Sequence, residues 1–273
     1  IEFIFAQTGV STIFASGENI PKIFEYFSGG QLPSLKNVIS FDSVTEEQKQ
    51  NAKEKGFEII TWAEFLDLGK EVLPLPEVTK DTIFTLSYTS GTTGLPKAVM
   101  LSHHNFVSYL GATEDMEGLH IDDLGPLDVH ISYLPLAHIL ERTFIHIALF
   151  RGARIGFSDP FKLKDDMAVL KPTFLVSVPR LYNKFFDTIK GTMNGTKGFK
   201  KKIADFALKA KTKDLKEKGH VKHGLLDPIV FSKAKAVTGG RIKFYMSGSA
   251  PIATDVVDFL KVSFCAPFIE GYG

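Results

Sequence analysis

The sequence is poor in cysteine, in net charge and in long apolar runs, and each absence excludes a class of protein. Its only cysteine, Cys265, excludes an internal disulfide framework and fits a reducing compartment. The formal net charge of +1 gives no general signature of nucleic-acid binding. No apolar run reaches the ~18 residues of a membrane-spanning helix, because the best stretch, residues 131–150, is interrupted by charged side chains and histidines. We interpret Cys265, which has apolar neighbours, as a small buried residue rather than a catalyst.

The residues that are present are typical of a folded globular chain. The 273 residues are 44% hydrophobic and 23% charged, enough for one large or two modest domains. The chain begins with Ile1 inside an apolar stretch, without a secretory signal, and ends at "EGYG" without a polar tail. We therefore expect a piece of a longer protein, truncated at both ends.

Short runs of β-branched and aromatic residues alternate with segments of helical periodicity. The runs predict strands within residues 10–16, 37–41, 57–62, 81–90, 128–135, 153–157, 172–179, 241–251 and 266–273. Helices are predicted over residues 19–27 and 45–56, up to residue 69, from about 102 to 111, after the strands at 153–157 and 172–179, and over 254–262. This alternation predicts an α/β fold with parallel β-sheets flanked by helices.

A lysine-rich segment interrupts the pattern. Residues 197–222 contain ten lysines and three acidic residues. One interpretation is the solvated face of a helix, and the other is a contact with anionic lipid or an acidic ligand.

The stretch "YTSGTTGLPKAVMLSHHNF", residues 88–106, follows a predicted strand and has the composition of a phosphate-binding loop. Its glycines let backbone N–H groups converge on an anion, its hydroxyls add donors, and Lys97 adds a positive charge. The Walker pattern requires Gly-Lys followed by Ser or Thr, but here Lys97 lies three residues after Gly94 and precedes Ala98. The Rossmann pattern is also absent. We interpret the stretch as a phosphate site of another class, the alternative being a turn without function.

Three loops rich in Gly, Ser and Thr follow predicted strands, at residues 90–94, 247–250 and 271–273. Ligands of open α/β sheets bind at the carboxyl ends of the strands, so these loops are expected to face one cleft.

These residues also resemble a known family. "YTSGTTGLPKAVMLSH" is similar to the phosphate-loop motif of the adenylate-forming superfamily, which includes acyl-CoA synthetases, luciferases and peptide-synthetase adenylation domains, although the usual motif has Gly at the place of Ala98. Four later blocks resemble long-chain fatty acyl-CoA synthetases in order along the chain, namely "YLPLAHILERT", "KPTFLVSVPRLYNKFF", "GGRIKFYMSGSAPIATDVVDFL" and "EGYG".

The resemblance implies a fragment, residues 1–273, of the large N-terminal AMP-binding domain, without the C-terminal lid domain. It implies a ligase that joins a long-chain fatty acid to CoA in two steps. The carboxylate first attacks the α-phosphate of ATP to give acyl-AMP and pyrophosphate, and the CoA thiol then releases AMP. Because the first step brings two anions together, positive charge and oriented donors are needed.

The resemblance also implies roles for individual residues. The phosphates of ATP are assigned to Thr89, Ser90, Gly91, Thr92, Thr93 and Gly94, with Lys97 as partner of the leaving pyrophosphate. His138 is expected to orient the carboxylate and the α-phosphate, the alternative being a histidine packed among its helix neighbours. The adenine and acyl pocket is assigned to Gly248, Ser249, Ala250, Gly271, Tyr272 and Gly273, with Tyr272 stacking on adenine.

Three charged residues in these blocks are left with two interpretations. Glu141 and Arg142 form either a structural ion pair or capping contact on one helix, or a direct substrate contact, and Arg180 poses the same choice. No other histidine is assigned a role.

Further expectations concern cofactors and surroundings. The glutamate that holds Mg²⁺ in the family is expected beyond residue 273, so no metal ligand is assigned within this chain, and the fragment is expected to be inactive alone. Membrane association of the full-length protein is expected, on the endoplasmic reticulum, the mitochondrial outer membrane or the peroxisome inside the cell. No nucleic-acid partner is expected.

Two other functions compete with the ligase. A catalytically silent lipid- or nucleotide-binding module would keep the same motifs. A phosphotransferase would use the same glycine-rich loop, but the missing Walker spacing argues against it. Chain-length preference is not encoded in any motif, and a medium-chain or bubblegum-type ligase of the superfamily remains open.

Overall fold

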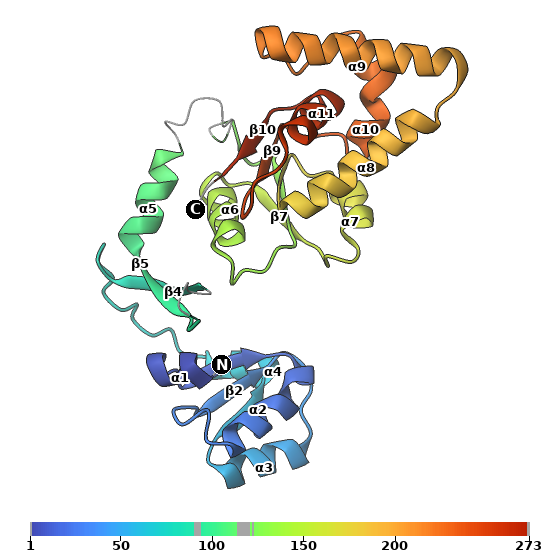
Figure 1. The fold of residues 1–273 in the computed structure, drawn as a ribbon. Coiled ribbons are helices and arrows are strands. Elements are labelled where there is room, and N and C mark those ends of the chain that lie inside the picture. Colours follow the sequence, from blue (N-terminus) through green and yellow to red (C-terminus); the bar gives the residue numbers. More distant parts are fainter. Residues whose placement is uncertain (1, 90–93, 114–120, 122, 272–273) are drawn as a thin grey trace. The chain divides into compact units, whose positions relative to one another are not determined.

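The computed structural model describes residues 2–89, 94–113, 121 and 123–271. It divides into two compact units, one formed by residues 1–82 and 88–100 and the other by residues 83–87 and 101–273. Both contain a parallel sheet with helices between the strands (Figure 1). Each unit is an α/β structure in its own right, which confirms the predicted fold class.

The first unit is built on a three-stranded sheet of order β1-β2-β3 in which both strand pairs are parallel. Val38 lies opposite Ile13 on one side and Ile59 on the other. The strands are β1 (Thr12–Ala15), β2 (Asn37–Ser40) and β3 (Glu58–Thr61). The helical elements are α1 (Glu2–Thr8), η1 (Gly17–Asn19), α2 (Ile20–Ser28), α3 (Glu46–Lys55) and α4 (Trp62–Leu68).

Local sequence signals define the helix ends in this unit. Thr45 caps α3 through a reciprocal pair of hydrogen bonds with Gln48, and Thr61 caps α4 in the same way with Glu64. Gly56 ends α3 with a left-handed φ of 98°. These are the boundaries that the sequence pattern predicts, because the capping chemistry is local to a few residues.

A two-stranded sheet of β4 (Ile83–Thr89) and β5 (Lys97–Ser102) contains the division between the units. The sequence pattern does not predict β5, because its short apolar run lies between a glycine-rich loop and a helix start. Pairing with β4 decides its conformation. The helix α5 (His103–Ala112) begins where predicted, since Ser102 and Asn105 form a reciprocal cap.

The second unit is built on a five-stranded sheet of order β10-β9-β8-β6-β7, and all four strand pairs are parallel. The strands are β6 (Val129–Ser132), β7 (Arg154–Phe157), β8 (Phe174–Ser177), β9 (Phe244–Ser247) and β10 (Phe268–Glu270). The helices are α6 (Ile139–Phe150), α7 (Leu163–Leu170), α8 (Pro179–Gly195), α9 (Gly198–Lys218), α10 (Ser232–Ala236) and α11 (Thr254–Phe264), with a π-helical turn η2 (Asp227–Phe231).

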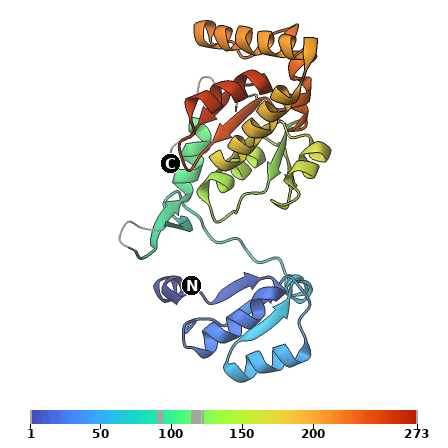
Figure 2. The same cartoon turned by 45° about the vertical axis from the view of Figure 1, so that its right-hand side comes forward.

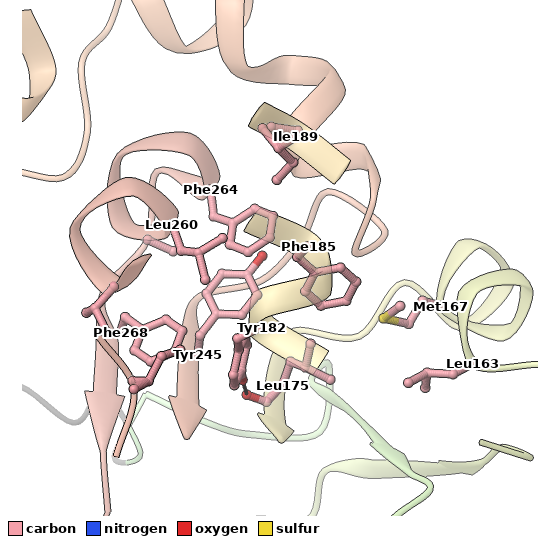
Figure 3. Close-up of a cluster of buried hydrophobic side chains, with 14 of the residues drawn as sticks. Leu163, Met167, Leu175, Tyr182, Phe185, Ile189, Tyr245, Leu260, Phe264 and Phe268 are labelled. Atoms are coloured by element: carbon pink, nitrogen blue, oxygen red, sulfur yellow. Dashed lines mark hydrogen bonds between the residues drawn. The ribbon is translucent and has the colours of Figure 1, made fainter. Parts of the chain in front are cut away.

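Both faces of this sheet are buried, so its central strand reads as a continuous apolar run. In β8, Phe174 and Val176 join the core under α6, whereas Leu175 joins the core under α7, α8 and α11. Figure 3 shows the second of these cores, where the rings of Tyr182 and Tyr245 pack among aromatic and aliphatic side chains. The buried hydroxyl of Tyr182 lies 2.9 Å from each of two strand carbonyls, Leu175 O and Met246 O, which share its single proton and satisfy its polar end.

The lysine-rich helix α9 lies at one end of this unit and packs against α8 and α11 (Figures 1 and 2). Most of its lysines are exposed or half-exposed, but Lys211 is 1% exposed, so the interpretation of a solvated face is wrong at that residue. The Nζ atom of Lys211 contacts Asp227 Oδ1 at 2.5 Å, Val262 O at 2.9 Å and Cys265 Sγ at 3.1 Å. Cys265 is buried, as predicted.

Candidate functional site

The loop that follows β9 carries three of the predicted site residues at the carboxyl edge of the five-stranded sheet. Gly248 N donates to Ser177 O at 3.1 Å, which ties the loop to the end of the neighbouring strand β8. Ser249 has a left-handed φ of 76°, a conformation that costs a residue with a side chain about 1–2 kcal/mol. The loop is therefore held in a strained shape that turns the exposed Ser249 and Ala250 away from the strand.

His138 lies directly before α6 and caps that helix. Its Nδ1 atom accepts a hydrogen bond from Leu140 N at 3.2 Å. A nitrogen that accepts carries no proton, so the neutral ring of His138 has its proton on Nε2. The imidazole is exposed and its Nε2 atom lies 3.5 Å from Ser249 Oγ. The structure therefore presents an N–H donor beside the loop after β9.

The helix α6 and the loop after β9 approach so closely that residue 248 has little room for a side chain. A Cβ atom added to Gly248 would lie 3.0 Å from Leu140 Cδ2. Two segments more than a hundred residues apart in the sequence, the N-terminus of α6 and the loop carrying Ser249, are thus neighbours. The structure brings His138, Gly248 and Ser249 together, and the roles that the resemblance implies for them stay a prediction.

A buried hydrogen-bonded pair, His130 and Glu141, lies beneath the first turn of α6. Glu141 Oε1 is 2.9 Å from His130 Nε2, and both side chains are fully buried. The ring of His130 stacks on Phe174 at 5.0 Å between centroids. The pair links α6 to β6, so it fixes the position of the helix that His138 caps. Sequence reasoning assigned no role to His130, and its only signal was a polar residue inside a strand pattern.

One of the two sequence interpretations expected an ion pair between Arg142 and Glu141, and the structure does not show it. The Nε and Nη2 atoms of Arg142 both donate to Leu136 O at 3.1 Å, and its Nη1 donates to Thr85 Oγ1 at 2.7 Å. The guanidinium thus holds the segment that leads into His138 and connects it to β4. Arg180, exposed at the start of α8, has no hydrogen bond or ion pair with the described residues, so its two interpretations both stand.

The segment after β10 reaches the same edge of the sheet. Gly271 N donates to Ser247 O at 2.8 Å, and a Cβ atom at Gly271 would lie 2.6 Å from Met246 Cε. Gly271 is therefore adjacent to β9, and Gly248 and Ser249 lie in the loop that follows this strand. That these loops face one cleft stays a prediction. Tyr272 and Gly273, the remaining predicted residues of this loop, lie outside the described residues.

The predicted phosphate loop belongs to the unit formed by residues 1–82 and 88–100. Thr89 ends β4, and Lys97 begins β5 as an exposed side chain without an ion pair to any described residue. Gly94 has a φ of 90°, which a side chain at that position would strain. Ala98 is half-buried in β5. Ser90, Gly91, Thr92 and Thr93 lie outside the described residues.

The described part of the chain contains neither a metal-binding cluster nor a membrane-spanning helix. No group of three or more His, Cys, Asp or Glu side chains there is arranged to hold a metal ion. None of the helices built from those residues is long and apolar enough to span a bilayer.

Comparison with known proteins now supplies the family. The sequence pattern of the family described as "AMP-binding enzyme" matches residues 1–273. Long chain acyl-CoA synthetase 4 of Arabidopsis thaliana is 37% identical over 278 residues, and long-chain-fatty-acid–CoA ligase 1 of Cavia porcellus is 34% identical over 281. Both alignments cover 100% of this chain but only 42% and 39% of the relatives. The chain thus spans about two fifths of the curated relatives' length.

Solved structures show the same fold at low sequence identity. The adenylation domain of a carboxylate reductase from Mycobacterium chelonae matches with a TM-score of 0.73 at 21% identity, covering 100% of this chain and 41% of that one. The corresponding domain from Segniliparus rugosus, in complex with AMP and a co-purified carboxylic acid, matches with a TM-score of 0.69 at 19% identity, covering 100% of this chain and 42% of that one. At such identities the likeness supports the fold alone. Because the family pattern extends over every residue of the sequence, the chain belongs to the AMP-binding enzyme family.

Proposed function

We propose that the protein containing this chain activates long-chain fatty acids in two steps, first to acyl-AMP with release of pyrophosphate and then to acyl-CoA with release of AMP. Residues 1–273 would form part of its large N-terminal adenylation domain. The observation that carries the proposal is the N–H donor of His138 beside the strained loop at Ser249, in a chain of the AMP-binding enzyme family. The relatives at 34–37% identity that are named long-chain acyl-CoA synthetases support the substrate class.

In this proposal the chain's own groups offset the repulsion between a carboxylate and a phosphate. His138 Nε2–H donates to an oxygen of the reacting carboxylate or α-phosphate, and its Nδ1 is already held by the backbone of α6. Lys97 pairs with the leaving pyrophosphate, whose oxygens are held by Thr89, Ser90, Gly91, Thr92, Thr93 and Gly94. The adenine and the acyl group are received by Gly248, Ser249, Ala250, Gly271, Tyr272 and Gly273.

ATP and CoA are the proposed co-substrates, and Mg²⁺ would neutralise phosphate charge when bound. Among the described residues, no group of three or more His, Cys, Asp or Glu side chains is arranged to hold it. We also propose an intracellular protein that associates with membranes of the endoplasmic reticulum, mitochondrion or peroxisome, and that binds no nucleic acid. Two Arabidopsis relatives are named as peroxisomal, which supports the peroxisome among the proposed locations.

The test is palmitate-dependent release of AMP by the whole protein that carries this chain. Replacing His138→Ala is expected to lower kcat/KM about 10²- to 10³-fold, the usual effect of removing one oriented donor at a developing charge. His138→Gln keeps a side-chain N–H and should lose less. His104→Ala removes an exposed histidine of α5 and serves as the control, with activity unchanged.

Two results would contradict the proposal. Release of ADP instead of AMP would indicate a phosphotransferase. Binding of ATP and palmitate without any product would indicate a silent binding module.

A further inference from the structure

A mainly apolar cavity lies away from the site described above, between α8, α9, η2 and α10. Its volume is about 450 Å³, within the range of small-molecule sites. The buried side chains of Ile189, Phe231 and Ala234, each less than 9% exposed, contribute to its wall. Figure 3 shows Ile189 on α8, beyond Phe185 and at the edge of the cluster of aromatic rings. The cavity is therefore lined by the same packed core that supports the sheet.

The threonine hydroxyls in the cavity wall have no free proton to donate to a ligand. Three threonines line the cavity, two within α8 and Thr196 directly after its end, and each hydroxyl donates to the carbonyl four residues earlier, at 2.8–3.0 Å. Their hydrogen-bonding capacity as donors is thus used by backbone carbonyls of α8. The rest of the lining is mainly aliphatic and aromatic. Such a surface favours an alkyl chain, whose transfer from water contributes about 0.8 kcal/mol per buried methylene.

Two residues of the cavity lining carry a positive charge. Lys200 and Lys233 both line the cavity and are exposed, and neither has an ion pair with any residue that the structure describes. No acidic side chain is among the lining residues. Other lysines of α9 are paired, such as Lys218 with Asp214 at 2.9 Å. Two unpaired ammonium groups over an apolar cavity complement a head group that is small and negative.

The cavity is separate from the candidate active site. The helix α8 starts at the carboxyl edge of the sheet, directly after β8. Thr192 and its neighbours line the cavity from the second half of α8. From Pro179 to Thr192 the axis advances about 20 Å at 1.5 Å per residue. None of the residues that line the cavity belongs to the candidate site around His138 and Ser249.

We propose that this cavity is a second, non-catalytic site for a fatty carboxylate, with the alkyl chain in the cavity and the carboxylate between Lys200 and Lys233. Its evidence is independent of the proposed catalytic reaction. If that reaction is also correct, the same class of molecule binds at two places, once as substrate and once as a ligand of the region between α8 and α9.

The test uses the full chain with ¹³C-labelled isoleucine δ1-methyl groups and laurate as the probe. Ile203 and Ile229 line the cavity, whereas Ile139 follows His138 at the start of α6. Laurate is expected to shift the methyl signals of Ile203 and Ile229 in a saturable way. Dodecyl maltoside, which has the same chain length and a neutral head group, should bind more weakly. Vesicles of phosphatidylglycerol should leave both signals unchanged, since the proposed ligand is a free carboxylate rather than a bilayer lipid.

Matched variants separate the site from general attraction to a basic helix. The double variant Lys200→Glu with Lys233→Glu should weaken laurate binding by about tenfold or more, because two charge-assisted contacts become repulsive. The control is Lys202→Glu with Lys209→Glu, which changes the net charge equally at exposed positions of α9 outside the cavity. Less than about twofold weakening is expected there, because salt screens distant charges. Ala204→Phe should abolish the shift by filling the cavity.

Three results would overturn the proposal. Equal weakening in the two double variants would show non-specific electrostatics. A response to vesicles but not to laurate would indicate a membrane-contact surface. A shift at Ile139 alone would place laurate only at the candidate active site, which would support the proposed reaction while removing the second site.

Discussion

At His138 a single imidazole caps a helix and supplies the proposed catalytic donor. Because Nδ1 accepts from Leu140 N, the neutral ring must carry its proton on Nε2, which lies on the side of Ser249. The helix therefore selects one tautomer, and the chemistry proposed for His138 follows from that selection.

The strain at Ser249 can be measured with two substitutions. Ser249→Ala keeps the left-handed backbone and removes the hydroxyl, whereas Ser249→Gly removes the hydroxyl and relieves the backbone at φ 76°. We expect the glycine variant to be more stable than the alanine variant by about 1 kcal/mol. Urea unfolding of both variants gives the difference. Equal stabilities would mean that the loop relaxes in alanine and that no strain is stored there.

At the scale of elements, a buried lysine joins α9 to η2 and α11. Lys211 contacts Asp227, the carbonyl of Val262 and Cys265, and its ammonium lies 4.7 Å from the ring centroid of Phe231. Burial alone would raise the pKa of Asp227, but the hydrogen bonds from Lys211 and from the backbone of His223 outweigh it and lower that pKa. Burial also raises the pKa of the Cys265 thiol.

This contact predicts a pH-dependent stability. A carboxyl group with a lowered folded-state pKa stabilises the fold above its unfolded pKa of ~3.9, and the contribution is lost as the pH falls through the folded value. Asp227→Asn should therefore cost about 3 kcal/mol at neutral pH, because it leaves Lys211 buried without a counter-charge. The difference in free energy of unfolding between this variant and the unmodified chain should become smaller below about pH 4, where Asp227 begins to be protonated in the unfolded chain.

Urea unfolding at pH 7 and near pH 3 tests this expectation. Asp214→Asn provides the control. Asp214 pairs with Lys218 on the exposed side of α9, so its loss should lower the free energy of unfolding much less. A loss that stays constant with pH would mean that shape, and not charge, makes Asp227 important.

At the scale of the whole molecule, the chain contains two parallel sheets with helices between their strands, and the segment of β4 and β5 belongs to both units. Residues 71–80 precede β4, have no regular structure and are fully on the surface. Even their apolar members are exposed, with Val72 at 100% and Leu75 at 92%. This segment packs against no core among the described residues.

Limited trypsin digestion should find this segment first. Lys70 and Lys80 flank it, and exposed, irregular backbone is the preferred substrate of proteases. We expect the first cleavages at these two lysines, before any in α9, whose many lysines are held in a helix. Mass spectrometry of the early fragments gives the order. First cuts within α9 would show that this helix opens more readily than its packing on α8 and α11 suggests.

Residue patterns alone were sufficient for much of this structure. Helix caps and apolar runs are local signals that act within a few residues, as at Thr45, at Gly56 and in β8. They determine the helices, the strands and the α/β class without reference to tertiary contacts. The resemblance in ordered motifs likewise indicates the family from the sequence alone. Its assignment of phosphate-loop and adenine-pocket residues stays a prediction.

Only the tertiary structure decided which of these elements meet. β5 becomes a strand because β4 is available to pair with it, His130 becomes a partner of Glu141 because β6 lies under α6, and Lys211 is buried because η2 and α11 enclose it. The approach of His138 to Ser249 across 111 positions depends on the same packing. Such contacts join residues that are distant in the chain, and a pattern with a period of two or 3.6 residues carries no information about them.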